Sequence, residues 1–153
     1  MSLLLVQHGK SLPKEEDPQR GLSAEGRKEV EQVASMLKKH GVAVSSIQHS
    51  GKKRARETAE IFSSYLGNNM NVIEMNGLAP LDDVTRINPP FEENTMMVGH
   101  LPFMERFVCF LITGSPDHLP VVKFKNGGIV ALAHDDETGG WYIKWTLFPN
   151  IEP

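Results

Sequence analysis

Short apolar runs alternate along this chain with longer segments whose apolar residues recur every three or four positions. Leu3 to Val6 is a continuous apolar run, which is typical of a strand buried on both faces. After Ser23, a suitable N-cap, apolar residues follow at helical spacing up to Leu37, and Gly41 ends this helix. The N-terminal third of the chain therefore begins with a strand and continues, after a polar loop, with an amphipathic helix.

The same alternation continues to the other end of the chain. Further strands are predicted within 42–50, at 71–75 and at 95–98, and two or three closing strands among 121–124, 129–133 and 141–147. A second helix is predicted to end at Gly67, and a third to run from Pro102 to Gly114. Strands that alternate with helices indicate an α/β fold, a three-layer αβα sandwich with a mainly parallel central sheet. No repeat or linker interrupts the pattern, so we expect residues 1–153 to form a single domain.

Composition narrows the function classes that suit such a fold. The formal net charge of −3 argues against a general nucleic-acid binder, so an anionic ligand must be attracted by a local cluster of cations. The single cysteine excludes an internal disulfide framework and a multi-cysteine zinc site, and it suits a reducing cytoplasm. The N-terminal apolar run is too short for a signal peptide or a membrane span, and no later segment is long enough. We therefore expect a cytoplasmic protein with neither nucleic acid nor a membrane as its partner.

Three of the predicted strands end in distinctive polar sequences. They are Gln7-His8-Gly9, His49-Ser50-Gly51 and Gly99-His100, and the second leads into Lys52, Lys53, Arg54 and Arg56 at a helix start. Ligands bind at the carboxyl ends of the strands in such sheets, and a helix N-terminus flanked by cations suits phosphate. Two histidines near one phosphate indicate nucleophilic catalysis, in which an imidazole attacks phosphorus and briefly carries the phosphoryl group.

Four elements at these strand and helix junctions together resemble the histidine phosphatase superfamily. They are Gln7-His8-Gly9, Arg20-Gly21-Leu22-Ser23 with Gly26, Ser50-Gly51-Lys52-Lys53-Arg54-Ala55 with Thr58-Ala59, and Val98-Gly99-His100-Leu101-Pro102. The corresponding elements of the family read Arg-His-Gly, Arg-Pro-Leu-Thr, Ser-Pro-x-x-Arg-Ala…Thr-Ala and Val-Gly-His-Asn-Pro. Each motif alone is weak, but four in the same order, each at the expected junction, make the resemblance specific over most of the chain.

The resemblance implies a phosphoglycerate-mutase-like fold and a phosphatase that uses His8 as the nucleophile and needs no metal or cofactor. The candidate catalytic residues are His8, His100 and Arg54, and the candidate substrate-binding residues are Arg20, Gln7 and Gly9. The short chain, without a large inserted cap domain, is more similar to the SixA-type protein-phosphohistidine phosphatases than to the phosphoglycerate mutases. The implied partner is a phosphorylated protein that displays phosphohistidine, or a small phosphomonoester.

Gln7 departs from the family pattern, which places an arginine directly before the nucleophile. Glutamine donates hydrogen bonds, but it has neither the positive charge nor the bidentate fork of arginine. The loss of one charged phosphoryl contact costs about 2–4 kcal/mol of transition-state stabilisation. Lys10, Lys52 or Lys53 are the candidates to replace that charge. The alternative function is a catalytically weak relative that binds phosphate or a phosphoprotein as a sensor or adaptor.

The general acid for the leaving group has no diagnostic motif. Larger family members use a carboxylate after the third strand, and Glu74, Asp82 and Asp83 lie in that region. A phosphohistidine substrate reduces the need for an acid, because imidazole leaves more easily than an alkoxide. The acid is therefore not assigned.

The other histidines and the cysteine are predicted to have structural or surface positions. His49 alternates with Ser50 along its strand and is expected to face away from the site, while His40, His118 and His134 are expected at the surface and Cys109 in the core. A zinc site built from His8, His49 and His100 is disfavoured, because the sequence lacks the close pairing of ligands that such sites use.

Overall fold

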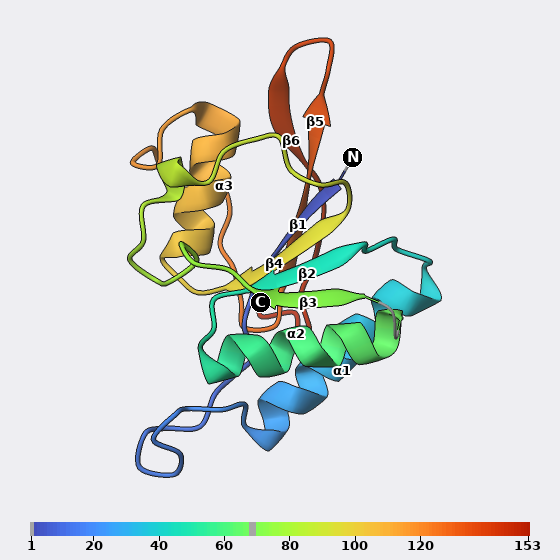
Figure 1. Ribbon diagram of the computed structural model, residues 1–153, viewed down its shortest axis with the longest axis vertical. Coiled ribbons are helices and arrows are strands. Elements are labelled where there is room, and N and C mark those ends of the chain that lie inside the picture. Colours follow the sequence, from blue (N-terminus) through green and yellow to red (C-terminus); the bar gives the residue numbers. More distant parts are fainter. Residues whose placement is uncertain (1, 68–69) are drawn as a thin grey trace.

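The computed structural model describes residues 2–67 and 70–153, which form one mixed sheet covered by helices on both faces (Figure 1). The strands are β1 (Ser2–Gln7), β2 (Ser46–His49), β3 (Asn71–Glu74), β4 (Thr95–Gly99), β5 (Ile129–Asp135) and β6 (Gly140–Leu147). The helices are α1 (Ala24–Lys39), α2 (Lys53–Leu66) and α3 (Phe103–Thr113), with a short 3-10 helix η1 (Val84–Arg86).

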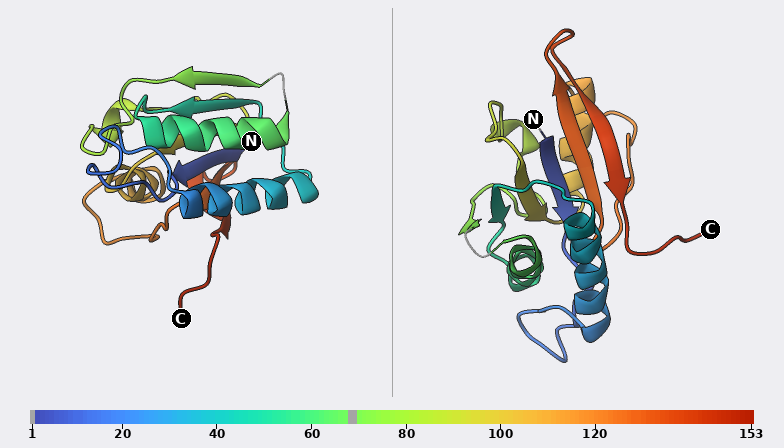
Figure 2. Two further views of the ribbon diagram at one scale, coloured as in Figure 1. Left: turned by 90° about the horizontal axis from the view of Figure 1, so that it is seen from below. Right: turned by 90° about the vertical axis from the view of Figure 1, so that its right-hand side faces the viewer.

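The sheet has the strand order β3-β2-β4-β1-β5-β6, with β1 near its centre. The pairs β2–β3, β2–β4 and β1–β4 are parallel, whereas β5 runs antiparallel to β1 and β6 antiparallel to β5. The predicted α/β sandwich with a mainly parallel sheet is therefore confirmed, with an antiparallel hairpin added at one side. Figure 2 shows the tip of this β5–β6 hairpin at the opposite end of the molecule from the loop that follows β1.

Two apolar cores fill the space between the three layers. The helices α1 and α2 lie on one face of the sheet and α3 on the other (Figure 1). Leu4 and Val6 of β1 belong to the core under α1 and α2, whereas Leu3 and Leu5 belong to the core under α3. All four side chains are completely buried. This alternation across a central strand explains why the N-terminal run is apolar at every position.

The predicted closing strand at 121–124 is wrong, whereas those at 129–133 and 141–147 are confirmed as β5 and β6. The backbone N–H of Phe124 donates to the carboxylate of Glu105 on α3, at 2.8 Å, rather than to a neighbouring strand. The side chain of Phe124 is nevertheless buried in the core under α3. The apolar residues here pack against a helix while their backbone stays irregular, which a hydrophobic pattern alone does not distinguish from a strand.

The loop after β1 is joined to the start of α1 by close backbone contacts. Ser23 caps the helix as predicted, because its hydroxyl accepts the N–H of Gly26 at 3.0 Å and donates to the carbonyl of Lys10 at 3.2 Å. Gly26 lies so close to Lys10 that a Cβ there would overlap the Lys10 carbonyl oxygen and lie 2.8 Å from its nitrogen. No helix in the described ranges is long and apolar enough to cross a membrane.

Gly26 supplies a test of this packing. Alanine normally stabilises a helix relative to glycine by about 1 kcal/mol. We expect Gly26→Ala to destabilise the protein instead, by about 1–3 kcal/mol, because the added methyl group overlaps the backbone of the loop. Urea unfolding of the wild type, Gly26→Ala and the surface control Ser35→Ala measures the difference. A Gly26→Ala protein as stable as the wild type would show that the loop does not pack against this turn.

Candidate active site

The ends of the neighbouring strands β1 and β4 bring His8 and His100 together. Gln7 pairs with Gly99 in the parallel register, so the residue that follows each of them lies at the same edge of the sheet. The backbone N–H of His8 donates to the carbonyl of Gly99 at 3.0 Å. The imidazole rings of His8 and His100 are tilted by 53° and their centroids are 5.0 Å apart. Residues 92 positions apart in the chain thus become neighbours, as the strand-end argument predicts.

The first turns of α2 bring Arg54 to the same place. Its Nε lies 3.3 Å from Nε2 of His8 and donates a hydrogen bond to it. One turn later, the hydroxyl of Thr58 accepts the backbone N–H of Gly9 at 3.0 Å and donates to the carbonyl of Arg54 at 2.7 Å. The chain after β1 is therefore attached to α2 at two successive residues, His8 and Gly9.

Arg20 approaches the same group from the loop between β1 and α1. It has a positive φ of 52°, and its Nη2 donates to the hydroxyl of Ser11 at 3.0 Å. Its positive charge lowers the pKa values of both His8 and Arg54. The structure thus groups three cationic or titratable side chains from β1, α2 and this loop. With His100 after β4, the candidate site is assembled from four separate parts of the chain.

Two side chains of α2 hold the Arg20 loop in place. The carboxylate of Asp17 accepts the N–H of Gly21 at 2.9 Å and pairs with Nζ of Lys53 at 2.8 Å. These contacts lower the pKa of Asp17 to about 2, the Lys53 hydrogen bond having the largest effect. The carboxylate of Glu57 accepts the N–H of Leu22 at 2.9 Å. The loop is tied to the helix that carries Arg54, and this fixes the two arginines relative to each other.

The hydrogen bonds of His8 determine which of its ring nitrogens is free to react. Nδ1 lies 2.6 Å from the carbonyl oxygen of Gly9, and a carbonyl only accepts, so the proton is on Nδ1. Nε2 then carries the lone pair, which faces Arg54. Burial is the main cause that lowers the pKa of His8 to about 4, and the charges of Arg54 and Arg20 lower it further. The imidazole is therefore neutral at neutral pH, the form in which it is a nucleophile.

His100 is more deeply buried and also neutral. Burial is the largest cause that lowers its pKa to about 3, followed by the charges of His8, Arg54 and Lys52. Its Nε2 lies 2.6 Å from the hydroxyl of Ser50, at the end of β2. Its Nδ1 is buried and has no hydrogen-bond partner among residues 2–67 and 70–153. A buried unpaired polar atom is costly, so this position suits a ligand that supplies the missing partner.

Gly9 and Gln7, the other two predicted substrate-binding residues, contact groups of the protein or are buried. The N–H of Gly9 is used by Thr58, so Gly9 contributes its carbonyl to His8 rather than a free N–H to a ligand. Gln7 is buried, and its side-chain oxygen has no hydrogen-bond partner in the part of the chain that the structure describes. No hydrogen bond joins its side chain to His8, Arg54 or His100, all of which the structure describes.

Only one of the three lysines considered as replacements for the missing arginine is available. Lys10 pairs with Glu25 at 2.9 Å and with Glu29 at 3.4 Å, and Lys53 pairs with Asp17. Lys52 is exposed and has no ion pair with any residue that the structure describes. Its charge also contributes to the lowered pKa of His100. Of the three, Lys52 alone has a free charge that acts on the site.

Of the three candidate acids, Glu74 is the last residue of β3, and Asp82 and Asp83 lie between β3 and η1. Asp82 accepts the N–H of Ala79 at 2.8 Å. Asp83 caps η1, and its hydrogen bonds with Thr85 lower its pKa, so it remains ionised. The carboxylate of Glu74 packs against Gly51, at the turn between β2 and α2. Asp82 and Asp83 thus have structural roles in turns, whereas Glu74 lies beside the turn that leads into α2.

Sequence reasoning gave no role to Ser50 or Asn126. Ser50 was part of the third family-like motif, which was a usable signal for its contact with His100. Asn126 donates from Nδ2 to the carbonyl of His8 at 3.1 Å, and the N–H of Gly127 donates to the same oxygen at 3.1 Å. Asn126 lies in the irregular chain before β5, where no sequence pattern indicates a contact with β1.

The remaining histidines do not form a site with His8. His49 is buried, and its Nδ1 accepts the N–H of Gly51 at 3.1 Å. Its charged neighbours are Glu74, Arg56 and Glu60 rather than the groups around His8. Within residues 2–67 and 70–153, no three His, Cys, Asp or Glu side chains are placed to hold a metal ion together. His40 and His118 are exposed, His134 pairs with Asp136 near the hairpin tip, and Cys109 is buried.

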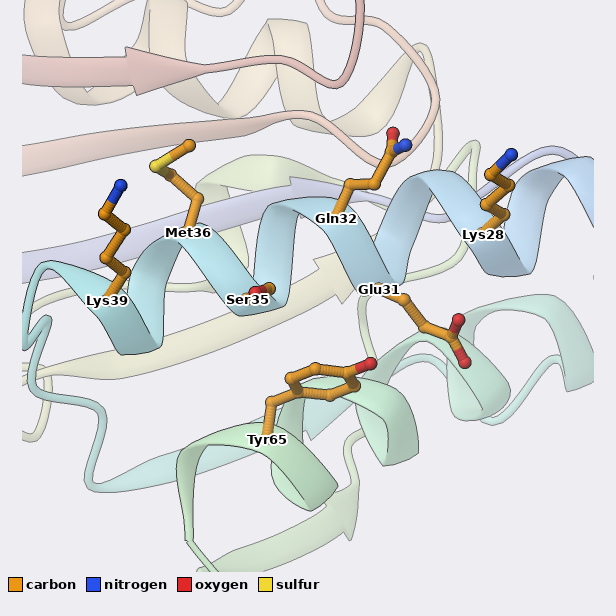
Figure 3. A pocket seen from close by; sticks show the side chains of 7 residues that line it. All are labelled: Lys28, Glu31, Gln32, Ser35, Met36, Lys39 and Tyr65. Atoms are coloured by element: carbon orange, nitrogen blue, oxygen red, sulfur yellow. The ribbon is translucent and has the colours of Figure 1, made fainter.

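A separate hollow of about 440 Å³ lies between α1 and the C-terminal end of α2 (Figure 3). It is lined by Lys28, Glu31, Gln32, Ser35, Met36, Lys39 and Tyr65. Charges of both signs line it, and none of its residues belongs to the four family-like motifs. The candidate active site lies at the opposite, N-terminal end of α2.

Comparison with protein-family models identifies the class to which this arrangement belongs. Residues 3–83, more than half of the chain, match the model of the histidine phosphatase superfamily (branch 1). The chain belongs to this superfamily. The matched region includes His8, Arg20 and Arg54, while His100 lies beyond it. A search of curated proteins found no match.

Solved structures with the same fold include phosphatases and a mutase. The protein histidine phosphatase SixA complexed with tungstate superposes with a TM-score of 0.79 at 23% identity, covering 97% of each chain. A protein assigned as the phosphohistidine phosphatase SixA of Agrobacterium tumefaciens gives a TM-score of 0.72 at 22% identity, over 95% of this chain and 96% of that chain. Phosphoglycerate mutase from Plasmodium falciparum gives 0.67 at 24% identity, over 94% and 88%. The fold is therefore phosphoglycerate-mutase-like.

The lowered pKa values of the two site histidines predict how stability depends on pH. Both titrate near 6.5 when unfolded but near 4 (His8) and 3 (His100) when folded. Below about pH 6.5 the unfolded state binds more protons, so the free energy of unfolding decreases as the pH is lowered, by up to about 1.4 kcal/mol per pH unit for each histidine. Above about pH 6.5 their contribution is constant.

Urea unfolding from about pH 7 to about pH 4.5 measures this slope. The variant His8→Asn, which keeps a polar side chain but does not titrate, should show a smaller slope than the wild type. An identical slope in both proteins would mean that the pKa of His8 is not lowered by folding.

Proposed function

We propose that this protein is a metal-independent phosphatase that takes a phosphoryl group onto Nε2 of His8 and passes it to water. The substrate is phosphohistidine in a protein or a small phosphomonoester. The observation that carries the proposal is the fixed tautomer of His8, whose Nδ1 proton is held by the Gly9 carbonyl. That bond leaves the Nε2 lone pair beside Arg54, in a neutral ring. A neutral imidazole facing a guanidinium is suited to attack a phosphoryl group that the guanidinium binds.

The reaction has two balanced steps. In the first, the lone pair of His8 Nε2 forms the N–P bond while the bond from phosphorus to the leaving group breaks, and the leaving imidazole or alkoxide takes a proton from water, which leaves hydroxide. In the second, a water molecule attacks phosphorus and loses a proton to that hydroxide, the N–P bond breaks, and its electron pair returns to Nε2 as inorganic phosphate leaves. In both steps the proton remains on Nδ1 and is donated to the Gly9 carbonyl. This hydrogen bond stabilises the phosphorylated ring.

Arg54, Arg20 and His100 bind the phosphoryl oxygens in this proposal. In the free protein the Arg54 Nε–H donates to His8, and an incoming phosphoryl oxygen gives this guanidinium a charged acceptor in its place. With the Ser50 hydroxyl donating to Nε2 of His100, the buried Nδ1–H of His100 remains as an unpaired donor for the same group. Fixed donors in a buried site stabilise the charge that develops during transfer.

Two features of the protein histidine phosphatase SixA support an open site that receives a phosphoryl group. The superposition with the protein histidine phosphatase SixA covers 97% of both chains. The two chains therefore have nearly the same length, and neither has a large additional region over the site. An uncapped site accepts a phosphate displayed on a protein surface. The structure of that relative holds tungstate, an oxyanion with the shape of phosphate.

Gln7 favours a second function, in which the protein binds phosphate or a phosphoprotein without efficient turnover. Its amide lies where the family places a cation, and its oxygen is buried without a partner. A missing positive charge weakens transition-state stabilisation more than it weakens ground-state binding of phosphate. Measurements on His8 and Gln7 variants distinguish the two functions.

The phosphohistidine intermediate is tested directly by trapping. We expect acid-labile, base-stable phosphorylation of the wild type by a labelled phosphohistidine protein, and none in His8→Ala, whose hydrolysis rate should fall by at least about a thousandfold. His49→Ala, which removes a histidine outside the group, is the matched control and should be phosphorylated like the wild type. EDTA should leave the rate unchanged. A rate lost in EDTA and restored by zinc, or an active His8→Ala protein, would contradict the mechanism.

The role of Gln7 is tested by restoring the family's charge. If no other cation replaces it, Gln7→Arg should raise kcat/KM for p-nitrophenyl phosphate by about one to three decades. If Lys52 has taken over, the rate should stay level or fall in Gln7→Arg, and Lys52→Ala should lower it. Lys10→Ala is the control, because the Glu25 and Glu29 carboxylates already hold that charge. Phosphate binding without turnover in both the wild type and Gln7→Arg would favour the sensor function instead.

A further inference from the structure

A basic cavity of about 500 Å³ adjoins the candidate active site at the N-terminal end of α2. It is lined by Lys14, Pro18, Gln19, Arg20, Gly51, Lys52, Lys53, Arg54 and Arg56. Arg20 and Arg54 belong both to this cavity and to the group around His8. The cavity therefore begins where the phosphoryl group would be held and extends outward over the loop after β1.

The cationic side chains that line the cavity outnumber the carboxylates that pair with them. None of the nine lining residues is acidic, although the whole chain has a formal net charge of −3. Lys53 is neutralised by Asp17, and Arg56 lies 3.7 Å from Glu60 in an exposed pair. The charge of Arg20 lowers the pKa of Arg54, as expected for cations that repel each other.

Two lysines of the lining have free charges. Lys14 and Lys52 are exposed, and neither has an ion pair with any residue in the described part of the chain. Lys14 lies in the loop after β1 and Lys52 at the start of α2, so the free charges come from both walls. Glu15 and Glu16 follow Lys14 in the loop but do not line the cavity. An anion bound here therefore meets uncompensated positive charge.

The chemistry of the lining indicates what kind of anion fits. Pockets for small organic ligands are mostly apolar, with a few polar groups that orient the ligand. Pro18 is the one apolar side chain among the nine lining residues, and none is aromatic. Nothing in the lining therefore suits a nucleobase or a sugar ring. Long, mobile lysine side chains at an exposed rim suit several hydrated carboxylates spread over a surface.

We propose that this cavity docks an acidic segment of the substrate protein, next to the phosphoryl group that His8 receives. This inference rests on the proposed function and adds a selectivity to it. Acidic side chains beside the phosphorylated residue would contact Lys14, Lys52 and Arg56, while the phosphoryl group contacts Arg20 and Arg54. Opposite charge on the two surfaces also speeds association.

The docking is tested by binding, independently of turnover. The probes are two short fluorescent peptides with a central unphosphorylated histidine, one with several flanking glutamates and one with glutamines in their place. Fluorescence polarisation is measured with the wild type, Lys14→Glu and the matched control Lys28→Glu. Lys28 is exposed, unpaired within the described residues and part of the separate hollow between α1 and α2 (Figure 3).

We expect the glutamate peptide to bind the wild type more tightly than the glutamine peptide, with a difference that shrinks as salt is added. Lys14→Glu should weaken its binding by about three- to tenfold, a larger loss than in Lys28→Glu, which changes the net charge equally. Thermal unfolding checks that both variants are folded. Equal binding of the two peptides, or equal losses in the two variants, would overturn the proposal.

Two further measurements distinguish a small polyanion from a protein segment as the ligand, and failure of the docking proposal from failure of the proposed function. Tripolyphosphate that binds more tightly than the glutamate peptide, with the same dependence on Lys14, would overturn the protein-surface assignment in favour of a small polyanion. With the phosphohistidine forms of both peptides, Lys14→Glu should lower kcat/KM for the acidic one by about three- to tenfold and leave p-nitrophenyl phosphate unchanged. Absence of turnover on every substrate, together with the expected binding, would refute the phosphatase function and leave the docking site standing.

Discussion

The parallel pairing of β1 with β4 is the interaction on which the candidate site depends. It places Gln7 opposite Gly99, and the next hydrogen bond of the ladder joins the His8 N–H to the Gly99 carbonyl. The two imidazoles are neighbours because the strands that carry them end at the same edge. A shift of this register by one residue would turn the alternating side chains of β1 to the opposite faces and separate the two rings. The buried apolar residues on both faces of β1 therefore fix the site as well as the cores.

One face of α2 then holds both His8 and the loop that follows it. Arg54 and Thr58, one turn apart, contact His8 and the N–H of Gly9. Lys53 and Glu57, also one turn apart, hold Asp17 and the N–H of Leu22. Residues four apart lie on the same side of a helix, so these four side chains form two adjacent rows. A single helix thereby fixes both His8 and the loop that carries Arg20.

Burial and positive charge act in the same direction on the two histidines. Both keep the rings neutral, and the guanidiniums of Arg20 and Arg54 repel each other across the same space. In the proposed function, an oxyanion relieves this repulsion and pairs with Nδ1 of His100, which has no hydrogen-bond partner among the described residues. The free protein is thus arranged for an anion, and the basic cavity beside it extends that preference beyond the size of one phosphate.

The sequence by itself determined the order of helices and strands and the membership of the superfamily, because these depend on local periodicity and on short motifs. It also placed His8, Arg54 and His100 at strand and helix ends that the fold brings together. Only the tertiary structure decided which lysines are free, since Lys10 and Lys53 are neutralised by carboxylates 15 to 36 positions away. It also decided the tautomer of His8, the unpaired oxygen of Gln7 and the irregular path of residues 121–124. The physical reason is the same in each case: a polar group's partner is set by packing between distant segments, which no local pattern of residues records.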